Sequence, residues 1–341
     1  MQVFARAERV DAKGARWSGM GVTGLLLAAA LAYGAPLRAQ QAGSAAEVPS
    51  APAPSASTPQ FPPVSPANFT AASPTREEVE QFLKVSWGYD HDRVWQVYAV
   101  ENTPAPNISK VTVHVAQKSS PQQIATLNFY VTPDGKHLIA NEILPFGAHP
   151  YADTRRTLQE RANGPSRGAA DKKFEFVEFA DFQCPHCKAT EPIIERLLQD
   201  FPQAHFVFEN FPLTSIHSEA YKAASYGVCV AQQGGDAAFF KFADAVFANQ
   251  AALTPEGSDA ALGDAVSKAG LDPAKVGSCT YTSAGKAPVD ASIKLAQDLF
   301  VNETPMLFID GRQIPVGEVA NGQLPYEKLK EIVAYQFSLD Q

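Results

Sequence analysis

Two cysteines separated by two residues are the feature of this sequence best suited to chemistry. They lie in Cys184-Pro185-His186-Cys187, at the start of a stretch with helical spacing of apolar residues. At such a position, unpaired backbone N–H groups and the helix dipole favour negative charge on the first sulfur. A stabilised thiolate is both the attacking and the leaving group in thiol–disulfide exchange. Pro185 suits the first helical turn, and His186 adds a donor or a positive charge close to the sulfur.

Half of a zinc site is the alternative interpretation of this spacing. A structural zinc site needs a second pair of cysteine or histidine ligands at ligand spacing. The remaining cysteines, Cys229 and Cys279, lie far apart and have no close partner in sequence. The pattern therefore favours a reversible disulfide between Cys184 and Cys187, with no metal and no cofactor beyond that disulfide.

The elements around the cysteines follow the order of an α/β domain. Phe174–Phe179 is an almost continuous apolar run typical of a buried strand, Cys184–Asp200 has helical spacing, and His205–Phe208 is a second strand. This opening is β-α-β. A long helical stretch then runs from Ser218 to about Leu299. The chain closes with a strand at Met306–Asp310, a turn at Asp310-Gly311, a short strand, and an amphipathic helix over Pro325–Phe337.

Three segments of this domain resemble DsbA-type thiol:disulfide oxidoreductases. They are Phe176–Cys187, Phe206–Leu213 and Asn302–Gly311, and the resemblance covers about residues 172–338. It implies a thioredoxin-like fold with an inserted helical subdomain, and dithiol chemistry on proteins outside the cytoplasm. It also implies that Thr304-Pro305 is a cis-proline loop that faces the cysteines and presents backbone groups to an extended substrate.

One carboxylate of the incoming strand completes the expected site. Glu178 lies six residues before Cys184, so we expect it buried beneath Cys187, where it can exchange a proton with that thiol. The alternative is a strand-edge charge that faces water, as expected for Glu175. Of the two cysteines, Cys184 is expected to be the exposed nucleophile, because Cys187 points back into the helix.

The direction of electron flow is less constrained than the chemistry. A stabilised Cys184 thiolate stabilises the reduced pair and favours oxidation of protein thiols, with His186 as the expected cause. Thr304 stands where the best-known oxidase of the family has valine. That oxidase also lacks an additional N-terminal domain. Both differences point to isomerase or reductase activity. A different class of function is a binding or chaperone module in which the Cys184–Cys187 pair is a static staple. Such a staple would need neither Glu178 nor Thr304-Pro305.

The other two cysteines frame the helical stretch. Cys229 and Cys279 are either buried free thiols or a structural disulfide. An oxidising compartment favours the disulfide, and members of the resembling family with cysteines at similar places support it.

The beginning of the chain predicts export. Basic residues precede an uncharged stretch, Trp17–Leu37, with a Leu- and Ala-rich centre, which is the layout of a secretory signal peptide over residues 1–39. An uncleaved membrane anchor is the alternative. Either way, the remainder is expected to be periplasmic or otherwise extracytoplasmic. Residues 40–72, rich in Ala, Pro and Ser, are expected to form a disordered tether.

Residues 73–147 predict a small α+β domain. A capped helix begins near Ser73–Glu78, and four strand-like runs follow, with a turn at Pro133-Asp134-Gly135. The runs are Val94–Val100, Val111–Ala116, Ile124–Val131 and His137–Leu144. The histidines of this domain, His91, His114 and His137, are expected on the surface or on strand faces rather than as metal ligands. Residues 148–168 are expected to form a connecting helix and linker, and residues 169–341 the thioredoxin-like domain, with its insertion at about 214–300.

Charge and composition limit the partners. The chain of 341 residues has a net charge of −8, which argues against binding to nucleic acid. The expected partners are secreted protein substrates and a membrane or soluble redox partner. The extra domain also raises the hypothesis of a homodimer formed through it.

Overall fold

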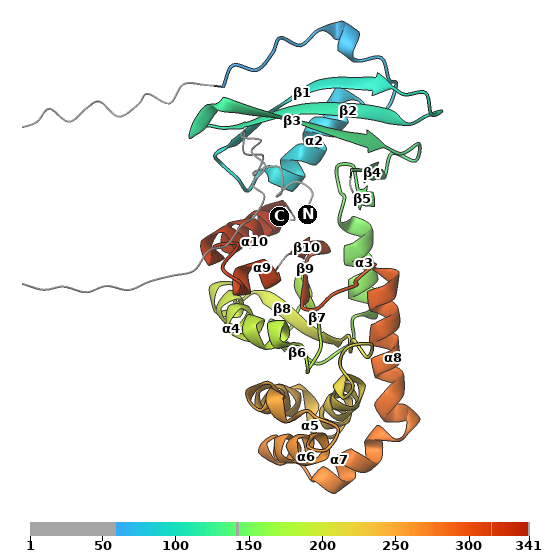
Figure 1. Cartoon of the computed structure of the whole chain (residues 1–341), viewed down its shortest axis with the longest axis vertical. Helices are drawn as coiled ribbons and strands as arrows, with labels where there is room; N and C mark the ends of the chain where they lie inside the picture. Colours follow the sequence, from blue (N-terminus) through green and yellow to red (C-terminus); the bar gives the residue numbers. More distant parts are fainter. Residues whose placement is uncertain (1–58, 141–142, 315, 340–341) are drawn as a thin grey trace, which may run out of the picture.

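The structure is a computed structural model that describes residues 59–140, 143–314 and 316–339. The expected signal segment, and residues 40–58 of the expected tether, lie outside these residues. Figure 1 shows an antiparallel sheet with one helix at one end of the molecule and helices of the insertion at the other, with a second sheet between them.

The N-terminal sheet is a meander in the order β1-β2-β3-β4-β5. Its strands are β1 (Arg93–Asn102), β2 (Ser109–Gln117), β3 (Ser120–Val131), β4 (His137–Ile139) and β5 (Ile143–Pro145). Helix α2 (Arg76–Trp87) packs on it and begins with a capping box, in which the Thr75 side chain and Glu78 each bond the other's backbone N–H. Together these elements enclose their own apolar core.

Two details of this region differ from the sequence-based expectation. The described part of the expected tether, residues 59–72, is held against the N-terminal unit rather than disordered: a 3-10 turn (Pro66–Asn68) leads to Phe69, which bridges Val100 and packs on the N-terminal core. The half-buried Phe69 ring and the backbone bonds from Thr70 and Ala71 to the Val100 carbonyl oxygen hold this segment on the sheet. The expected strand His137–Leu144 is two strands, β4 and β5, which pair with each other.

The second sheet has the order β10-β9-β7-β8-β6. Strands β7 (Phe174–Ala180) and β8 (Ala204–Asn210) are parallel, and β9 (Met306–Ile309), β10 (Arg312–Ile314) and β6 (Ser166–Gly168) are antiparallel to their neighbours. Strand β6 lies in the stretch expected to be linker. With only three residues, it is too short to show a periodicity of its own.

Helices follow the expected order around this sheet. They are α3 (Ala152–Arg161), α4 (Pro185–Asp200), α5 (Ala220–Ala248), α6 (Ser258–Lys268), α7 (Pro273–Thr280), α8 (Ser283–Asp298), α9 (Val316–Ala320) and α10 (Tyr326–Leu339). Helix α5 is kinked at Gly235, whose φ of 75° is in the left-handed region that favours glycine. The expected thioredoxin-like fold with a helical insertion is confirmed, and the short helix α9 is an addition to it.

The two faces of β7 have different neighbours. Phe176 belongs to the core formed with α4, α10 and the insertion, whereas Val177 and Phe179 belong to a core formed with α3 and α8. Since side chains alternate along a strand, Glu178 lies on the same face as Phe176, toward α4. This alternation decides which carboxylate can reach the cysteines.

A buried arginine joins the N-terminal unit to the second sheet. Arg312 of β10 is 1% exposed, and its Nη2 donates to the Ser86 carbonyl oxygen near the end of α2 at 2.8 Å. Its guanidinium also lies over the rings of Tyr89 and Tyr151. The Tyr335 hydroxyl of α10 donates to the carbonyl oxygen of Lys84, which lies in α2 as Ser86 does. These contacts lie at the end of β9 opposite the cysteines.

Candidate active site

The two cysteines lie at the start of α4, as the sequence predicts. Cys184 is the N-cap, Pro185 is the first helical residue, and Cys187 lies in the first turn. Both sulfurs are free thiols in this structure. Cys184 is less open than expected, with 4% of its surface exposed against 0% for Cys187. Cys184 keeps slightly more exposed surface than Cys187, but the expected exposed nucleophile is itself buried.

The two thiols have opposite acidities. A hydrogen bond from the Cys187 thiol is the largest cause that lowers the pKa of Cys184 to about 5; Thr304 and the backbone N–H groups of Cys187 and His186 add to it, against the effect of burial. Burial raises the pKa of Cys187 well above its ordinary value, and the charges of Cys184 and Glu178 add to that rise. The pair thus has one thiolate near neutral pH and one thiol that keeps its proton.

His186 acts differently from the sequence-based expectation. Its side chain is exposed, and its contribution to the lowered pKa of Cys184 comes from its backbone N–H. His186 therefore lowers the pKa of Cys184 as part of the helix N-terminus and not through a charge on its imidazole ring.

Glu178 lies buried at the base of the site. It is 0% exposed, and the Thr190 hydroxyl contacts its Oε1 at 3.4 Å while also donating to the Cys187 carbonyl oxygen at 2.8 Å. Burial is the main cause that raises the pKa of Glu178 well above its usual range, and the Glu191 carboxylate adds to it. A buried carboxyl group whose pKa is raised in this way can give a proton to Cys187 and take it back. Glu175, expected to face water, is buried too, at 2% exposure, but on the opposite face of β7.

Thr304 and Pro305 close the site from the strand that follows the insertion. Their peptide bond is cis, as expected. The Thr304 carbonyl oxygen lies 3.4 Å from Cys184 Sγ and can accept from the thiol when it is protonated. This contact places the backbone of the loop directly against the nucleophile, within reach of any chain that approaches Cys184.

Asp181 is a site residue that the sequence analysis missed. Its backbone N–H donates to Cys187 Sγ at 3.4 Å, and its carboxylate accepts from the backbone N–H groups of Gln183 and Leu213. The same carboxylate lies 2.7 Å from His217 Nδ1. Asp181 thus fixes the loop after β8 against the loop that carries the cysteines.

The insertion holds the cysteine loop from its other side. Gln250 Nε2 donates to the carbonyl oxygens of Phe182 and Cys184, both at 2.9 Å. Gln183 bonds Leu253 and Glu219 in the same subdomain. Nothing in the sequence marks these glutamines, because their partners are distant along the chain.

Comparison with known proteins identifies the family. Residues 160–334, half of the chain, match the family described as thioredoxin, and this stretch contains both cysteines, Glu178 and the Thr304–Pro305 loop. The chain belongs to the thioredoxin family. The resemblance inferred from the three sequence segments is confirmed at this level.

Relatives of this thioredoxin-family chain include parts of much larger proteins. It is 31% identical over 147 residues to a Na(+)/H(+) antiporter, NhaA 3, of Salinispora tropica, in a match that covers 43% of this chain and 22% of the antiporter. The chain thus spans about a fifth of the length of the curated relatives it matches. In the described residues, no helix is both long and apolar enough to cross a membrane.

Solved structures at lower identity are also similar. Oxidised BdbD from Bacillus subtilis is 21% identical with a TM-score of 0.45, over 51% of this chain and 93% of BdbD. The thiol-disulfide exchange protein alpha-DsbA2 from Wolbachia pipientis is 22% identical with a TM-score of 0.41, over 52% of this chain and 96% of that protein.

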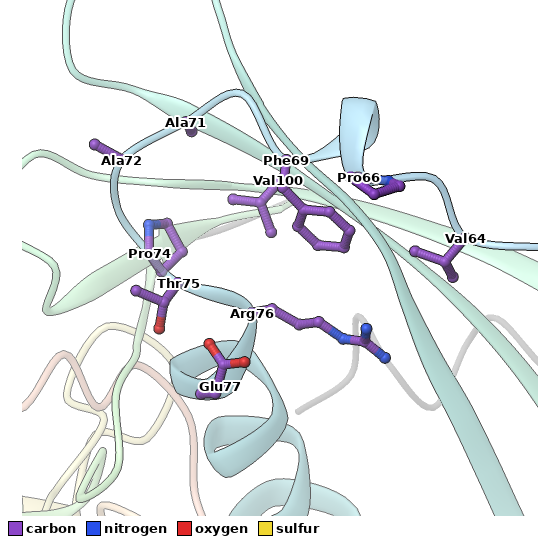
Figure 2. A pocket seen from close by; sticks show the side chains of 10 residues that line it. All are labelled: Val64, Pro66, Phe69, Ala71, Ala72, Pro74, Thr75, Arg76, Glu77 and Val100. Carbon is purple, nitrogen blue, oxygen red and sulfur yellow. The ribbon is translucent and has the colours of Figure 1, made fainter.

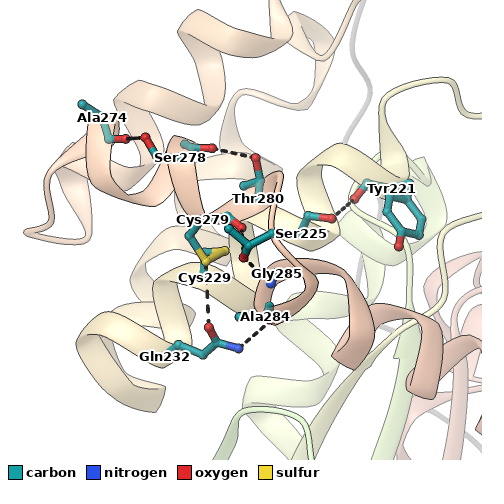
Figure 3. The surroundings of a disulfide bond; sticks show 12 residues. Tyr221, Ser225, Cys229, Gln232, Ala274, Ser278, Cys279, Thr280, Ala284 and Gly285 are labelled. Atoms are coloured by element: carbon teal, nitrogen blue, oxygen red, sulfur yellow. Dashed lines mark hydrogen bonds between the residues drawn. A yellow bond between two sulfur atoms is a disulfide. The ribbon is translucent and has the colours of Figure 1, made fainter.

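The second pair of cysteines in this thioredoxin-family chain is a disulfide. Cys229 of α5 and Cys279 of α7 are bonded, with 6.0 Å between their Cα atoms, as the sequence analysis favoured (Figure 3). Gly285 of α8 lies against it, and a Cβ atom there would come within 2.9 Å of the Cys229 sulfur. Three helices of the insertion therefore meet at this bond.

A pocket on the N-terminal unit lies apart from the cysteines. A pocket of about 470 Å³ on the N-terminal unit is lined by Phe69, Pro74, Arg76, Val100 and their neighbours (Figure 2). None of its lining residues belongs to the cysteine site. Among the described residues, no group of three or more His, Cys, Asp or Glu side chains could hold a metal ion. The N-terminal histidines have other neighbours: His114 contacts Thr126, and His137 contacts Asp134.

Proposed function

We propose that this protein is an extracytoplasmic thiol:disulfide oxidoreductase that oxidises protein thiols through Cys184 and Cys187. The observation that carries the proposal is the placement of the two cysteines: Cys184 is the N-cap of α4 beside the Thr304 carbonyl oxygen, while Cys187 is fully buried, as is Glu178. This placement lowers the pKa of Cys184 to about 5 and raises that of Cys187. A static staple would need no such difference. A reactive first thiol and a protonated second thiol are what exchange through a mixed disulfide needs.

The reaction balances as a two-electron exchange. A substrate thiolate attacks Cys184 Sγ of the Cys184–Cys187 disulfide, and the bond to Cys187 breaks as the new S–S bond forms. Cys187 leaves as a thiolate and takes a proton, with the Glu178 carboxyl as the donor. A second substrate thiolate then attacks the mixed disulfide and releases Cys184 as a thiolate. The substrate loses two electrons, which the cysteine pair gains.

The direction of this exchange follows from the acidity of Cys184. A thiolate stabilised by the protein stabilises the reduced pair, which makes the disulfide the stronger electron acceptor. We therefore propose that the protein oxidises substrate thiols, in preference to isomerising or reducing disulfides. A membrane or soluble partner must accept the two electrons in each cycle.

Location and assembly belong to the same proposal. The Cys229–Cys279 disulfide is typical of oxidising compartments, and the basic and apolar beginning of the sequence suits export. Secreted proteins with free thiols are the proposed substrates. The N-terminal unit, with its own core, is the proposed surface for a homodimer.

A trapping experiment tests the assignment of the nucleophile. Cys187→Ser should accumulate mixed disulfides with substrate proteins through Cys184, because the thiol that resolves them is gone. Cys184→Ser, the matched control, should trap few. Non-reducing electrophoresis and mass spectrometry would measure both, and better trapping by Cys184→Ser would show that the assignment is wrong.

A further inference from the structure

Disulfide exchange at this site places negative charge on a buried sulfur. When a substrate thiolate attacks Cys184, the electron pair of the broken S–S bond goes to Cys187 Sγ. Cys187 is 0% exposed and belongs to the main apolar core of the domain. Because a buried charge without a donor is costly, the groups around Cys187 Sγ decide how easily the bond breaks.

A backbone N–H points at this sulfur. It belongs to Asp181, the first residue after β7, and it donates to Cys187 Sγ at 3.4 Å. Burial is the main cause that raises the pKa of Cys187, and this hydrogen bond acts against it. A donor that is already in position before the reaction stabilises the charge that develops on the leaving sulfur.

The peptide group that carries this N–H is also held at its carbonyl end. In a trans peptide the C=O and N–H bonds point in opposite directions. The carbonyl oxygen of the same peptide group, that of Ala180, accepts from the Phe211 N–H at 2.8 Å. Phe211 begins the loop that follows β8. The bond to this loop therefore directs the Asp181 N–H the other way, toward Cys187.

The loop after β8 holds the Asp181 side chain as well. The carboxylate accepts from the Gln183 N–H at 2.7 Å and from the Leu213 N–H at 2.8 Å. It also lies 2.7 Å from His217 Nδ1, which must carry the proton of this bond because an ionised carboxylate only accepts. Gln183 and Leu213 supply backbone groups, whereas His217 donates through its side chain. A substitution at position 217 can therefore remove one support of Asp181 selectively.

We propose that the Asp181 N–H stabilises the charge on the leaving Cys187 sulfur, and that His217 is the positioning residue that keeps this N–H in place. The inference rests on the proposed function, since the charge arises only if the Cys184–Cys187 disulfide exchanges. Cys187 Sγ takes the electron pair while it accepts from Asp181, and then takes the proton of the Glu178 carboxyl. His217 acts through Asp181 rather than on the sulfur itself.

The test measures how fast a thiol peptide reduces the oxidised Cys184–Cys187 pair of the full chain, with acid quenching and alkylation as the readout. His217→Ala should slow this step about tenfold, as expected when one hydrogen bond that supports a developing charge is weakened. His217→Asn should recover most of the rate, because the Asn amide N–H can replace the ring Nδ1–H as the donor to Asp181.

His205 supplies a matched control in the same domain. Its Nδ1 lies 2.7 Å from the Ala169 carbonyl oxygen, so His205→Ala also removes a histidine that bonds another part of the chain. His205 lies near the start of β8, whereas the cysteines follow the end of the parallel strand β7. His205→Ala should therefore keep the wild-type rate even where it lowers the melting temperature.

Two further readouts separate positioning from a general loss of structure. The alkylation midpoint of Cys184 should stay near 5 in His217→Ala, because the hydrogen bonds that lower its pKa come first from the Cys187 thiol and then from Thr304 and the helix N-terminus. In isotope-labelled wild type, the amide proton resonance of Asp181 should move when the disulfide is reduced, because the sulfur that accepts its hydrogen bond changes. This movement should be smaller in His217→Ala.

Several results would overturn the inference. An unchanged rate in His217→Ala, or no recovery in His217→Asn, would show that His217 does not position the N–H. An Asp181 amide resonance that ignores reduction of the wild-type disulfide would show that this N–H does not serve the sulfur. A shifted Cys184 midpoint in His217→Ala, or an equal loss of rate in His205→Ala, would assign His217 to the fold alone. If the wild-type pair does not react with the peptide at all, the proposed function itself fails.

Discussion

Cys184 and Cys187 differ in acidity because they occupy different depths of one helical turn. Cys184 receives hydrogen bonds from the Cys187 thiol and from the helix N-terminus, while Cys187 is enclosed with Glu178 behind it. The motif in the sequence indicates this chemistry. It does not show that the second thiol is the main stabiliser of the first, since that depends on side-chain orientation.

The pH dependence of alkylation tests this account. In the reduced protein, the rate of Cys184 alkylation should rise with pH through a midpoint near 5 and level off before neutral pH, because the thiolate is the reactive form and predominates above its pKa. An ordinary thiol would keep gaining reactivity to about pH 8.5. Cys187→Ala should raise the midpoint because it removes the donor. His186→Ala should change it less, since His186 acts through its backbone; the opposite ranking would contradict the assignment.

Glu178 can be tested against a carboxylate on the same strand. Glu178→Gln should slow exchange about a hundredfold at neutral pH, because no carboxyl group then gives a proton to Cys187. Glu175→Gln is the matched control: Glu175 is also buried, and burial also raises its pKa, but it lies on the opposite face of β7. Stopped-flow measurement of exchange with a thiol peptide checks both. Equal exchange rates in the two variants would show that Glu178 takes no part in the proton transfer.

The helical insertion stabilises the site through contacts that lie far from the cysteines in sequence. Gln250 bonds the backbone on either side of Gln183, and Asp181 bonds the loop that ends in α5. The sequence predicts these helices and the strands around them, since apolar periodicity and turn residues mark both. It does not predict which polar residues meet, because partners such as Gln250 and Cys184 are separated by 66 positions.

The disulfide within this insertion should be structural. Cys229–Cys279 should resist reductant under conditions that open Cys184–Cys187, so mass mapping after mild reduction should show alkylation at Cys184 and Cys187 alone. Replacing both Cys229 and Cys279 with alanine should lower the free energy of unfolding by up to about 4 kcal/mol, because the bond closes a loop of 50 residues. Equal labelling of all four cysteines would contradict a structural role.

At the scale of the whole molecule, the N-terminal unit docks away from the reactive end of the second sheet. Arg312 donates to Ser86 at the end of α2, and Lys328 of α10 lies 3.4 Å from Asp90. The sequence predicts both folding units from their separate patterns. It gives no signal for this junction, because a single arginine in a short strand resembles a surface residue until its burial is known.

Removal of this arginine should loosen the junction and leave the chemistry unchanged. Arg312→Leu should destabilise the protein by about 2 to 3 kcal/mol, because a charged hydrogen bond in a buried place is lost. Proteolysis between residues 146 and 166 should become faster, with the Cys184 alkylation midpoint unchanged. Arg196→Leu, which removes an exposed arginine bonded to Glu327, is the control and should have little effect on either. A shift of the Cys184 alkylation midpoint in Arg312→Leu would show that the junction between the two units affects the cysteine site.

The most direct test of the central claim is a redox titration of the purified chain against glutathione, followed by thiol alkylation and mass mapping. We predict that Cys184 and Cys187 are reduced and oxidised together, with a reduction potential above about −200 mV, closer to DsbA at about −120 mV than to thioredoxin at about −270 mV. A Cys184–Cys187 pair as reducing as thioredoxin would contradict the oxidation of substrate thiols. A pair that does not equilibrate with glutathione would contradict the proposal that this protein exchanges disulfides.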